Sequence, residues 1–309
     1  MKHPSKTLNA TAFIVSLFAI TLTFLSAETM AVITPWLLFI SIVVLGIPHG
    51  AIDHIVAARV YGLNETLKGH LLFYTSYLFV MLLVGLLWLV FPIGGMAFFL
   101  LISIYHFGQA DMVSLVNPKS KFSALFAWTR GLLVIGIIIF GHPEISLPII
   151  ETAIRSQPEW FSFLFENATV LYLVVLFFYI TPVGLLLFSG DLLVVKSRFI
   201  LESVLLITLL TFTGPLVSFA IYFALWHSAG HVHEMIEYFR EKGENISIAK
   251  FYKLATPFTA VSLLGLLLLF FVHQAYAFGD EMISLLFILI SVLTLPHMFV
   301  VDRMFKDKN

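Results

Sequence analysis

Cysteine is absent from this chain of 309 residues. Without a thiol, the chain can form no disulfide, iron–sulfur cluster, thiolate metal site or cysteine nucleophile. Charged residues are also scarce: they make up 11% of the chain, against roughly 25% in an ordinary soluble domain. The 17 basic and 18 acidic residues leave no excess positive charge for a nucleic-acid surface. A metal site must therefore use histidine, aspartate or glutamate, and histidine is abundant at 11 residues.

Hydrophobic residues make up 60% of the chain, and apolar runs of about 18 or more residues recur along it. Such runs predict membrane-spanning helices, because a helix satisfies its own backbone polar groups in lipid. A transmembrane barrel would show short alternating segments instead. The sequence therefore predicts an all-α, polytopic transmembrane helical bundle that forms one integral-membrane domain over residues 1–309. We predict ten spans, at residues 11–26, 31–50, 70–91, 95–116, 122–141, 167–189, 199–213, 216–238, 254–277 and 282–301.

The distribution of charge supports this order of spans. If the N-terminus is cytoplasmic, the inside segments hold every lysine and arginine except Arg130, which falls inside a span, and Arg155. The positive-inside rule then places both termini in the cytoplasm. The seventh span is short and ends at Gly214-Pro215, which indicates a broken or re-entrant helix. We therefore expect a multi-pass protein of the inner cell membrane.

One polar stretch, Trp226–Glu234, interrupts the eighth predicted span. Within it, His227 and His231 are four residues apart and share one face of an α-helix, where two imidazoles can hold one metal ion. His233 lies about 200° from His231 around the helix, so it cannot face the same ion without distortion. The pair His227 and His231 is therefore our choice of metal ligands on this span.

Depth in the membrane selects two partners for this pair. Counting back from the next basic residue on the cytoplasmic side places His49 and His106 within roughly 6 Å of the level of the pair. Four imidazoles at one depth predict a single intramembrane metal site. Such ligands suit Zn, Cu, Fe or Ni and disfavour Mg and Ca. Each histidine taken alone also has a simpler interpretation, because a lone histidine in a membrane helix often bonds a neighbouring carbonyl.

Four more polar residues are predicted to orient the ligands rather than to bind the metal. Asp53 lies about 40° from His49 around the helix and could accept the second ring N–H of a ligand histidine. His297 follows Pro296 and lies nearer the predicted membrane surface. The full set is Asp53, His54, His233 and His297.

Several stretches together closely resemble one family of membrane enzymes. They are Pro48–His54 (PHGAIDH), Tyr105–Asp111 (YHFGQAD), Trp226–Glu234 (WHSAGHVHE) and the C-terminal Pro296-His297. The first is quite specific, whereas an isolated HxxxH is not, and the order and separation of all four strengthen the match. They resemble the bacterial and archaeal membrane β-carotene 15,15'-dioxygenase family, also called bacteriorhodopsin-related-protein-like.

The resemblance implies a non-haem Fe(II) enzyme. Its members would use dioxygen to cleave the central double bond of β-carotene into two molecules of all-trans-retinal, which a rhodopsin could use. The implied substrate is a hydrocarbon that dissolves in the membrane lipids, and the resemblance implies no nucleic-acid partner. The iron ligands that the family implies are the same four residues chosen above from phase and depth: His49, His106, His227 and His231.

Two other functions remain open from the residues alone. A membrane di-iron hydroxylase or desaturase acting on carotenoid or lipid would need about eight ligands, and the metal content would distinguish it. A transporter with a histidine relay would move ions without iron and without consuming oxygen.

Overall fold

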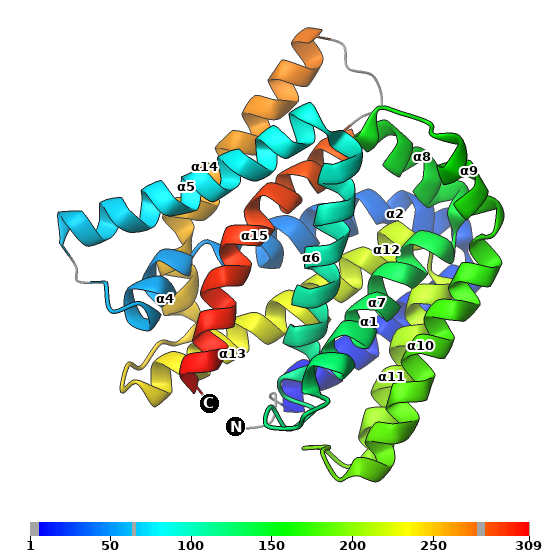
Figure 1. Ribbon diagram of the computed structural model, residues 1–309, viewed down its shortest axis with the longest axis horizontal. Coiled ribbons are helices and arrows are strands. Elements are labelled where there is room, and N and C mark those ends of the chain that lie inside the picture. The colour runs from blue at the N-terminus through cyan, green and yellow to red at the C-terminus, as the bar shows by residue number, and fades with distance from the viewer. Residues whose placement is uncertain (1–5, 64–65, 277–281, 309) are drawn as a thin grey trace. The chain divides into compact units, whose positions relative to one another are not determined.

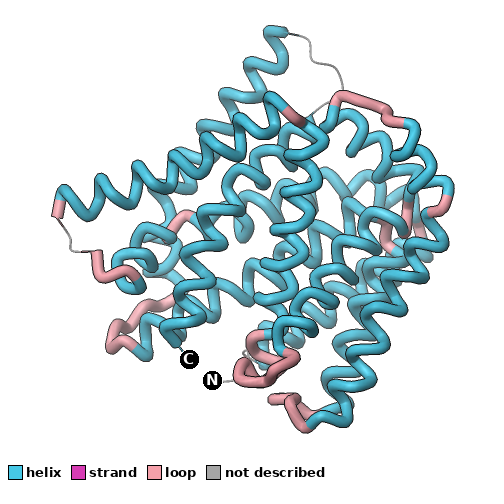
Figure 2. The backbone as a smooth tube through the Cα atoms, viewed as in Figure 1, coloured by secondary structure: helices cyan, strands magenta, loops and turns pink. Residues whose placement is uncertain are grey.

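The computed structural model describes residues 6–63, 66–276 and 282–308. Most of these residues are helical, and none of them lies in a β-strand (Figures 1 and 2). The all-α class predicted from the apolar runs is therefore confirmed. Residue 277, the predicted end of the ninth span, lies outside the described residues.

The helices follow one another closely along the chain. The first are α1 (Lys6–Leu25), α2 (Ala27–Ile40), η1 (Ser41–Gly46), α3 (Ile47–Gly50), α4 (Asp53–Val60), α5 (Leu67–Val90), α6 (Pro92–Met112), α7 (Ser123–Phe140) and α8 (Pro143–Ile154). They continue with α9 (Glu159–Glu166), α10 (Ala168–Ser189), α11 (Lys196–Phe212), α12 (Pro215–Ile221), η2 (Tyr222–Ser228), α13 (Ala229–Glu241), α14 (Ile248–Tyr276) and α15 (Met282–Lys308). The segments η1 and η2 are π-helices, and the others are α-helices.

Among the described residues, eight helical segments are long and apolar enough to cross a membrane, so the chain is a polytopic membrane protein. The seventh and eighth predicted spans are not among these eight. The seventh corresponds to α11, which has only 17 residues. The eighth corresponds to the continuous run of α12, η2 and α13, which carries the polar stretch Trp226–Glu234. The cytoplasmic location of the termini stays a prediction.

The helices group into two compact units, which we call unit 1 and unit 2. Unit 1 comprises Met1–Leu45, Ser103–Pro148 and Gln157–His233, and unit 2 comprises Gly46–Ile102, Ile149–Ser156 and Glu234–Asn309. In unit 1, α7 packs along α10 and also contacts α11 and α12, while α1 packs against α11 (Figure 1). In unit 2, α15 packs against α4 and α5, and α14 packs against α3. The prediction of one integral-membrane domain concerns the whole chain and stays a prediction.

In unit 1, two glycines bring α6 and α7 into backbone contact. A Cβ atom on Gly108 would lie 1.7 Å from the carbonyl oxygen of Ala127, and a Cβ on Gly131 would lie 1.7 Å from that of Ile104. Only glycine allows two helices to approach this closely, and membrane helices often pack in this way. The two contact points on α6, Ile104 and Gly108, lie two residues before and two residues after His106, so they fix this candidate ligand relative to α7.

The break predicted at Gly214-Pro215 separates α11 from α12. Gly214 has φ 76°, a left-handed conformation that glycine adopts without strain. Pro215 then occupies the first turn of α12, where its missing N–H costs no hydrogen bond. The helix that follows carries Trp226, whose indole Nε1 donates to Ser16 Oγ on α1 at 3.2 Å. This bond ties the histidine-bearing helix to the N-terminal helix of unit 1.

In unit 2, polar contacts hold α15 against α4 and α5. Trp88 Nε1 donates to Ser291 Oγ at 2.9 Å in the buried α5–α15 contact. The Tyr61 hydroxyl, just after α4, donates to the carbonyl of Phe299 at 3.2 Å. These contacts bring the start of α4, which carries Asp53, to the part of α15 that carries His297.

We expect Gly131→Ala to destabilise the protein, because the new methyl group would force α6 and α7 apart. Overpacking of this kind costs about 1–3 kcal/mol, which should lower the melting temperature of the purified protein in detergent. Gly184→Ala is the matched control, since α10 has nothing within 4 Å of a Cβ at that position. It should melt at the same temperature as the parent or higher, because alanine favours a helix. Equal melting temperatures for the two variants would contradict the close contact.

Candidate metal centre

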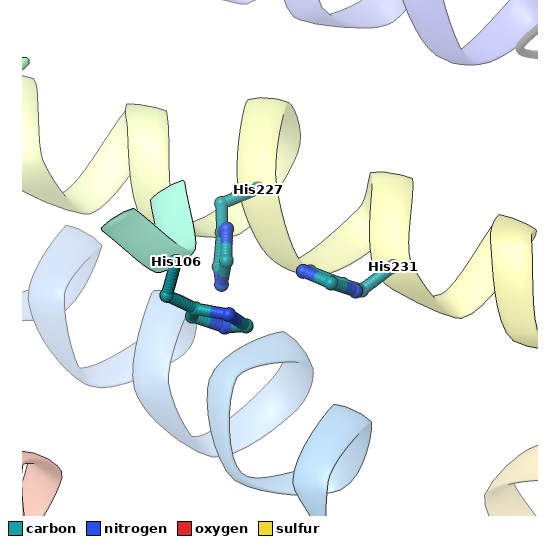
Figure 3. Close-up of side chains that lie close together, drawn as sticks. All are labelled: His106, His227 and His231. Atoms are coloured by element: carbon teal, nitrogen blue, oxygen red, sulfur yellow. The ribbon is translucent and has the colours of Figure 1, made fainter. Parts of the chain in front are cut away.

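Three histidines of unit 1 converge at one place: His106 on α6, His227 on η2 and His231 on α13 (Figure 3). Their candidate ligand nitrogens all lie within 4.8 Å of one another. The ring centroids of His106 and His227 are 4.9 Å apart, and those of His227 and His231 are 4.6 Å apart. The structure therefore brings together three of the four histidines that the sequence selected.

The three rings are buried, and aromatic side chains pack around that of His227. Each of the three histidines is only 2% exposed. Phe107 packs against His227 with ring centroids 4.6 Å apart, and Phe223 stacks on His227 at 5.7 Å. Packed aromatic neighbours restrict the imidazole to one orientation, and holding the ring in place is what precise metal ligation requires. Among the described residues this is the one group of three or more His, Asp or Glu side chains close enough to hold a metal ion.

The backbone at this site is not the regular α-helix that the sequence argument assumed. His227 lies in the π-helix η2, and the N–H of Ala229 bonds the carbonyl of Ala224, five residues back. A second π-helix, η1, ends two residues before Pro48, which has no N–H to donate to the preceding turn. Both candidate ligand stretches, around His49 and His227, therefore follow or include a π-helix, a feature often found at functional sites.

His49, the fourth predicted ligand, belongs to unit 2 and lies in the short helix α3. It is buried, with 6% of its surface exposed. The ring of His297 meets it edge to face, with centroids 4.8 Å apart. Its role as a ligand stays a prediction from the sequence.

Asp53 contacts His297 and Tyr77 within unit 2. His297 Nδ1 lies 2.9 and 3.0 Å from the two carboxylate oxygens of Asp53. The Tyr77 hydroxyl donates to the same carboxylate at 2.9 Å. The histidine that Asp53 contacts is therefore His297 on α15, which is not one of the four predicted ligands, and the role of Asp53 in orienting a ligand stays a prediction. His297 is buried at 5% exposure, and its predicted depth near the membrane surface stays a prediction.

The other two residues predicted to orient the ligands have different surroundings. In unit 2, the ring of His54 packs against Phe258 with centroids 4.6 Å apart, and Tyr74 stacks beside it at 6.5 Å. His233 is half-buried and is not part of the three-histidine group, as the helical phase predicted. The orienting roles of His54 and His233 stay predictions.

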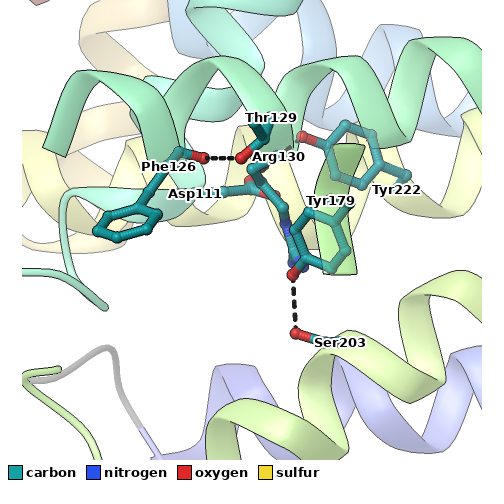
Figure 4. Close-up of polar contacts among 7 residues, drawn as sticks. All are labelled: Asp111, Phe126, Thr129, Arg130, Tyr179, Ser203 and Tyr222. Carbon is teal, nitrogen blue, oxygen red and sulfur yellow. Dashed lines mark hydrogen bonds and ion pairs between the residues drawn. The ribbon is translucent and has the colours of Figure 1, made fainter. Parts of the chain in front are cut away.

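The sequence argument missed a buried polar network in unit 1 (Figure 4). One of its members, Tyr222, has its ring 6.4 Å from that of His227. Arg130 pairs with Asp111, and the two side chains are 1% and 4% exposed. Tyr222, Tyr179 and Ser203 extend the network by hydrogen bonds. A signal was present, because a charged residue inside a predicted span usually has a partner and a function. Arg130 was the one basic residue that fell inside a span.

Comparisons with known proteins agree with the motifs. A model of the β-carotene 15,15'-dioxygenase family matches residues 40–305, which include all the histidines discussed above. A β-carotene 15,15'-dioxygenase from an uncultured marine bacterium (66A03) is 27% identical over 287 residues, covering 89% of this chain and 95% of that protein. A probable β-carotene 15,15'-dioxygenase, Blh, from Halobacterium salinarum is 26% identical over 291 residues, covering 85% of this chain and 82% of that protein. No solved structure matches the chain. The chain therefore belongs to the β-carotene 15,15'-dioxygenase family, a family of oxidoreductases.

Proposed function

We propose that this protein uses dioxygen to cleave the central 15,15' double bond of β-carotene, giving two molecules of all-trans-retinal. One observation carries the proposal. In a chain of this dioxygenase family, three buried imidazoles have ligand atoms within 4.8 Å of one another. The proposed cofactor is one Fe(II) ion, held by His106, His227, His231 and His49.

The donor set fits a mononuclear iron. Ring nitrogens are ligands that iron accepts readily, whereas Mg and Ca prefer oxygen. Neutral imidazoles add no negative charge, so the ion keeps its full positive charge. Four of them on a six-coordinate ion leave room for small molecules. When bound, Fe(II) would supply the redox chemistry that makes dioxygen reactive towards an alkene.

The overall reaction balances without any other reactant. The carbon–carbon double bond at the centre of β-carotene and the bond between the two oxygen atoms of dioxygen both break, and two carbon–oxygen double bonds form. Each oxygen atom of dioxygen enters one aldehyde, so no reductant is consumed and no leaving group departs. A general acid or base among the side chains is therefore not required, and the protein contributes ligands, orientation and a dry environment.

The side chains around the histidines serve to exclude water. His106, His227 and His231 are each 2% exposed, and Phe107, Phe223 and Tyr222 surround the ring of His227. A water-free site protects reactive oxygen species from side reactions. The same aromatic contacts hold the ring of His227 in one orientation.

His49 is proposed as the fourth ligand on the strength of its sequence. Its predicted depth matches that of the other three residues, and it lies in the PHGAIDH motif of the family. Its neighbours in unit 2 suit the role. His297 meets the His49 ring at 4.8 Å and is itself bonded to Asp53. Carboxylate–histidine pairs commonly stand beside or within metal sites.

The proposed substrate and the protein both partition into the lipid bilayer. β-Carotene is a long hydrocarbon that partitions into lipid, and eight helical segments among the described residues are able to cross a membrane. Because His106 lies on one of these segments, Pro92–Met112, the proposed site can receive β-carotene from the lipid without passing it through water. We propose that the protein resides in the inner cell membrane, in contact with its lipids, and that the retinal produced there is available to a rhodopsin.

Replacing any of His106, His227 or His231 by alanine should abolish retinal formation and weaken the binding of iron, because only three of the four proposed imidazole ligands then remain. Chromatography of the products and the metal content of the purified protein measure the two effects. His70→Ala is the matched control, since His70 is exposed, and it should retain full activity. Retinal formation at the parent rate in His231→Ala would refute the assignment.

Removal of the metal should stop the reaction reversibly. We expect a chelator to inactivate the purified protein, and Fe(II) to restore retinal formation at one iron per chain, whereas Zn(II) should not restore it. Two irons per chain together with a hydroxylated or desaturated C40 product would instead favour the di-iron hydroxylase. The two assays to combine are elemental analysis and product identification.

Asp53→Asn should lower the affinity for Fe(II) by roughly 10- to 100-fold, the usual effect of losing a carboxylate that orients a histidine near a metal. Ser291→Ala is the matched control, because it also removes a buried hydrogen bond from α15 in unit 2. The dissociation constant for Fe(II) of each variant is measured by titrating the metal-free protein with iron. If both variants bind iron equally well, Asp53 has no part in orienting the site.

A further inference from the structure

A buried ion pair lies close to the three histidines in unit 1. Arg130 Nε donates to Asp111 Oδ2 at 2.9 Å. The fully buried Tyr222 donates its hydroxyl to the other carboxylate oxygen, Oδ1, at 3.2 Å (Figure 4). Each oxygen of Asp111 therefore has its own partner. Burying an ion pair costs much of the attraction it gains, so such a pair is weak evidence for stability and points to a further role.

The bond between Asp111 and Tyr222 connects the same two helical segments as the histidines do. Asp111 follows His106 by five residues on α6, and Tyr222 precedes His227 by five residues in η2. The segments thus meet twice, once at this hydrogen bond and once where the two imidazole rings lie 4.9 Å apart. Along α6, the hydrogen bond at Asp111 lies about 7.5 Å from the imidazole contact at His106, at 1.5 Å per residue.

Phe107 contacts both Tyr222, which makes the hydrogen bond, and His227, which makes the ring contact. Its ring lies 5.4 Å from that of Tyr222 and 4.6 Å from that of His227. The ring of Tyr222 also stacks towards His227, with an interplanar angle of 26° and centroids 6.4 Å apart. Because buried side chains are closely packed, a shift of Tyr222 would be passed on to the imidazole of His227.

Arg130 fixes Asp111 to the rest of unit 1. Its Nη1 donates to the Tyr179 hydroxyl on α10 at 2.9 Å, and Tyr179 in turn bonds Ser203 Oγ on α11 at 2.8 Å. Next to Arg130, Gly131 brings α7 into backbone contact with α6. The carboxylate that receives the Tyr222 hydroxyl is thus held by three helices besides its own.

We propose that Tyr222 is a positioning residue. Its hydrogen bond to Asp111, anchored by Arg130, holds η2 against α6 at the separation at which His106 and His227 can share one metal ion. The inference rests on the proposed function, which assigns a metal to these histidines. In this proposal Tyr222 contacts neither the substrate nor dioxygen.

The test compares two Tyr→Phe variants of the full chain, purified without metal in lipid nanodiscs. Tyr222→Phe keeps the ring and the ion pair and removes only the hydroxyl. Tyr172→Phe is the matched control, because it removes another interhelical hydroxyl contact of unit 1, to Thr211 Oγ1 at 2.9 Å between α10 and α11. Co(II) is the probe, since its visible absorption reports the geometry of its ligands and titration gives its dissociation constant.

We expect Tyr222→Phe to bind Co(II) roughly 10- to 100-fold more weakly than the parent, the range found when a residue that supports metal ligands is lost. Its visible absorption should also change, whereas Tyr172→Phe should match the parent in both respects. Equal Co(II) affinity and identical spectra for the two variants would overturn the inference. Failure of the parent itself to bind Co(II) or Fe(II) would instead refute the proposed function.

A second variant covers the case in which Tyr222→Phe does not fold. Asp111→Glu keeps the negative charge beside Arg130 but moves the carboxylate by about one bond length relative to Tyr222. We expect the same weakening of Co(II) binding and the same change in absorption. Parent-like affinity and absorption in Asp111→Glu would overturn the inference that the Tyr222–Asp111 hydrogen bond positions the histidines.

Discussion

The cost of burying polar groups in lipid is the constraint on which this structure depends, because no water is present there to replace a lost hydrogen bond. The buried polar side chains accordingly meet one another across helices. Arg130 meets Asp111, and Asp53 meets His297. Helix α6 illustrates the consequence: within six residues it carries His106, the backbone contact at Gly108 and the carboxylate of Asp111. Polar contacts and close packing thus fix the same short segment.

Much of this arrangement could be predicted from the sequence. Long apolar runs specify helices in lipid whatever their details, so the all-α polytopic class needed no finer information. The convergence of His106 with His227 and His231 could be predicted too, because helical phase and depth are both fixed by counting residues. Helical phase also predicted that His233 does not face the same metal ion as His231. Both predictions assumed a regular α-helix, and the grouping of the three histidines agrees with them although His227 lies in a π-helix.

Other features could not be predicted, because they depend on which helices touch. The sequence argument placed Asp53 and His49 on one helical face, but a break at residues 51–52 separates α3 from α4, and the partner of Asp53 at 2.9 Å is His297, 244 residues along the chain. The hydrogen bond from Tyr222 to Asp111 spans 111 residues. The sequence predicted spans at residues 199–213 and 216–238, and neither is among the eight segments long and apolar enough to cross a membrane in the described part of the chain. Residue spacing gives the phase and depth of a side chain but does not determine which helices are neighbours, and the π-helix at η2 has no simple sequence signal.

The π-helix also bears on how such a site could arise. A π-helical turn corresponds to an α-helix that has gained one residue, and each residue of an α-helix turns the chain by 100°. An insertion of this kind upstream of α13 rotates every later side chain, His231 included, relative to the residues before Tyr222. The orientation that His227 and His231 share with Tyr222 therefore depends on the extra residue in this turn. In a regular α-helix over the same residues, these side chains would face different neighbours.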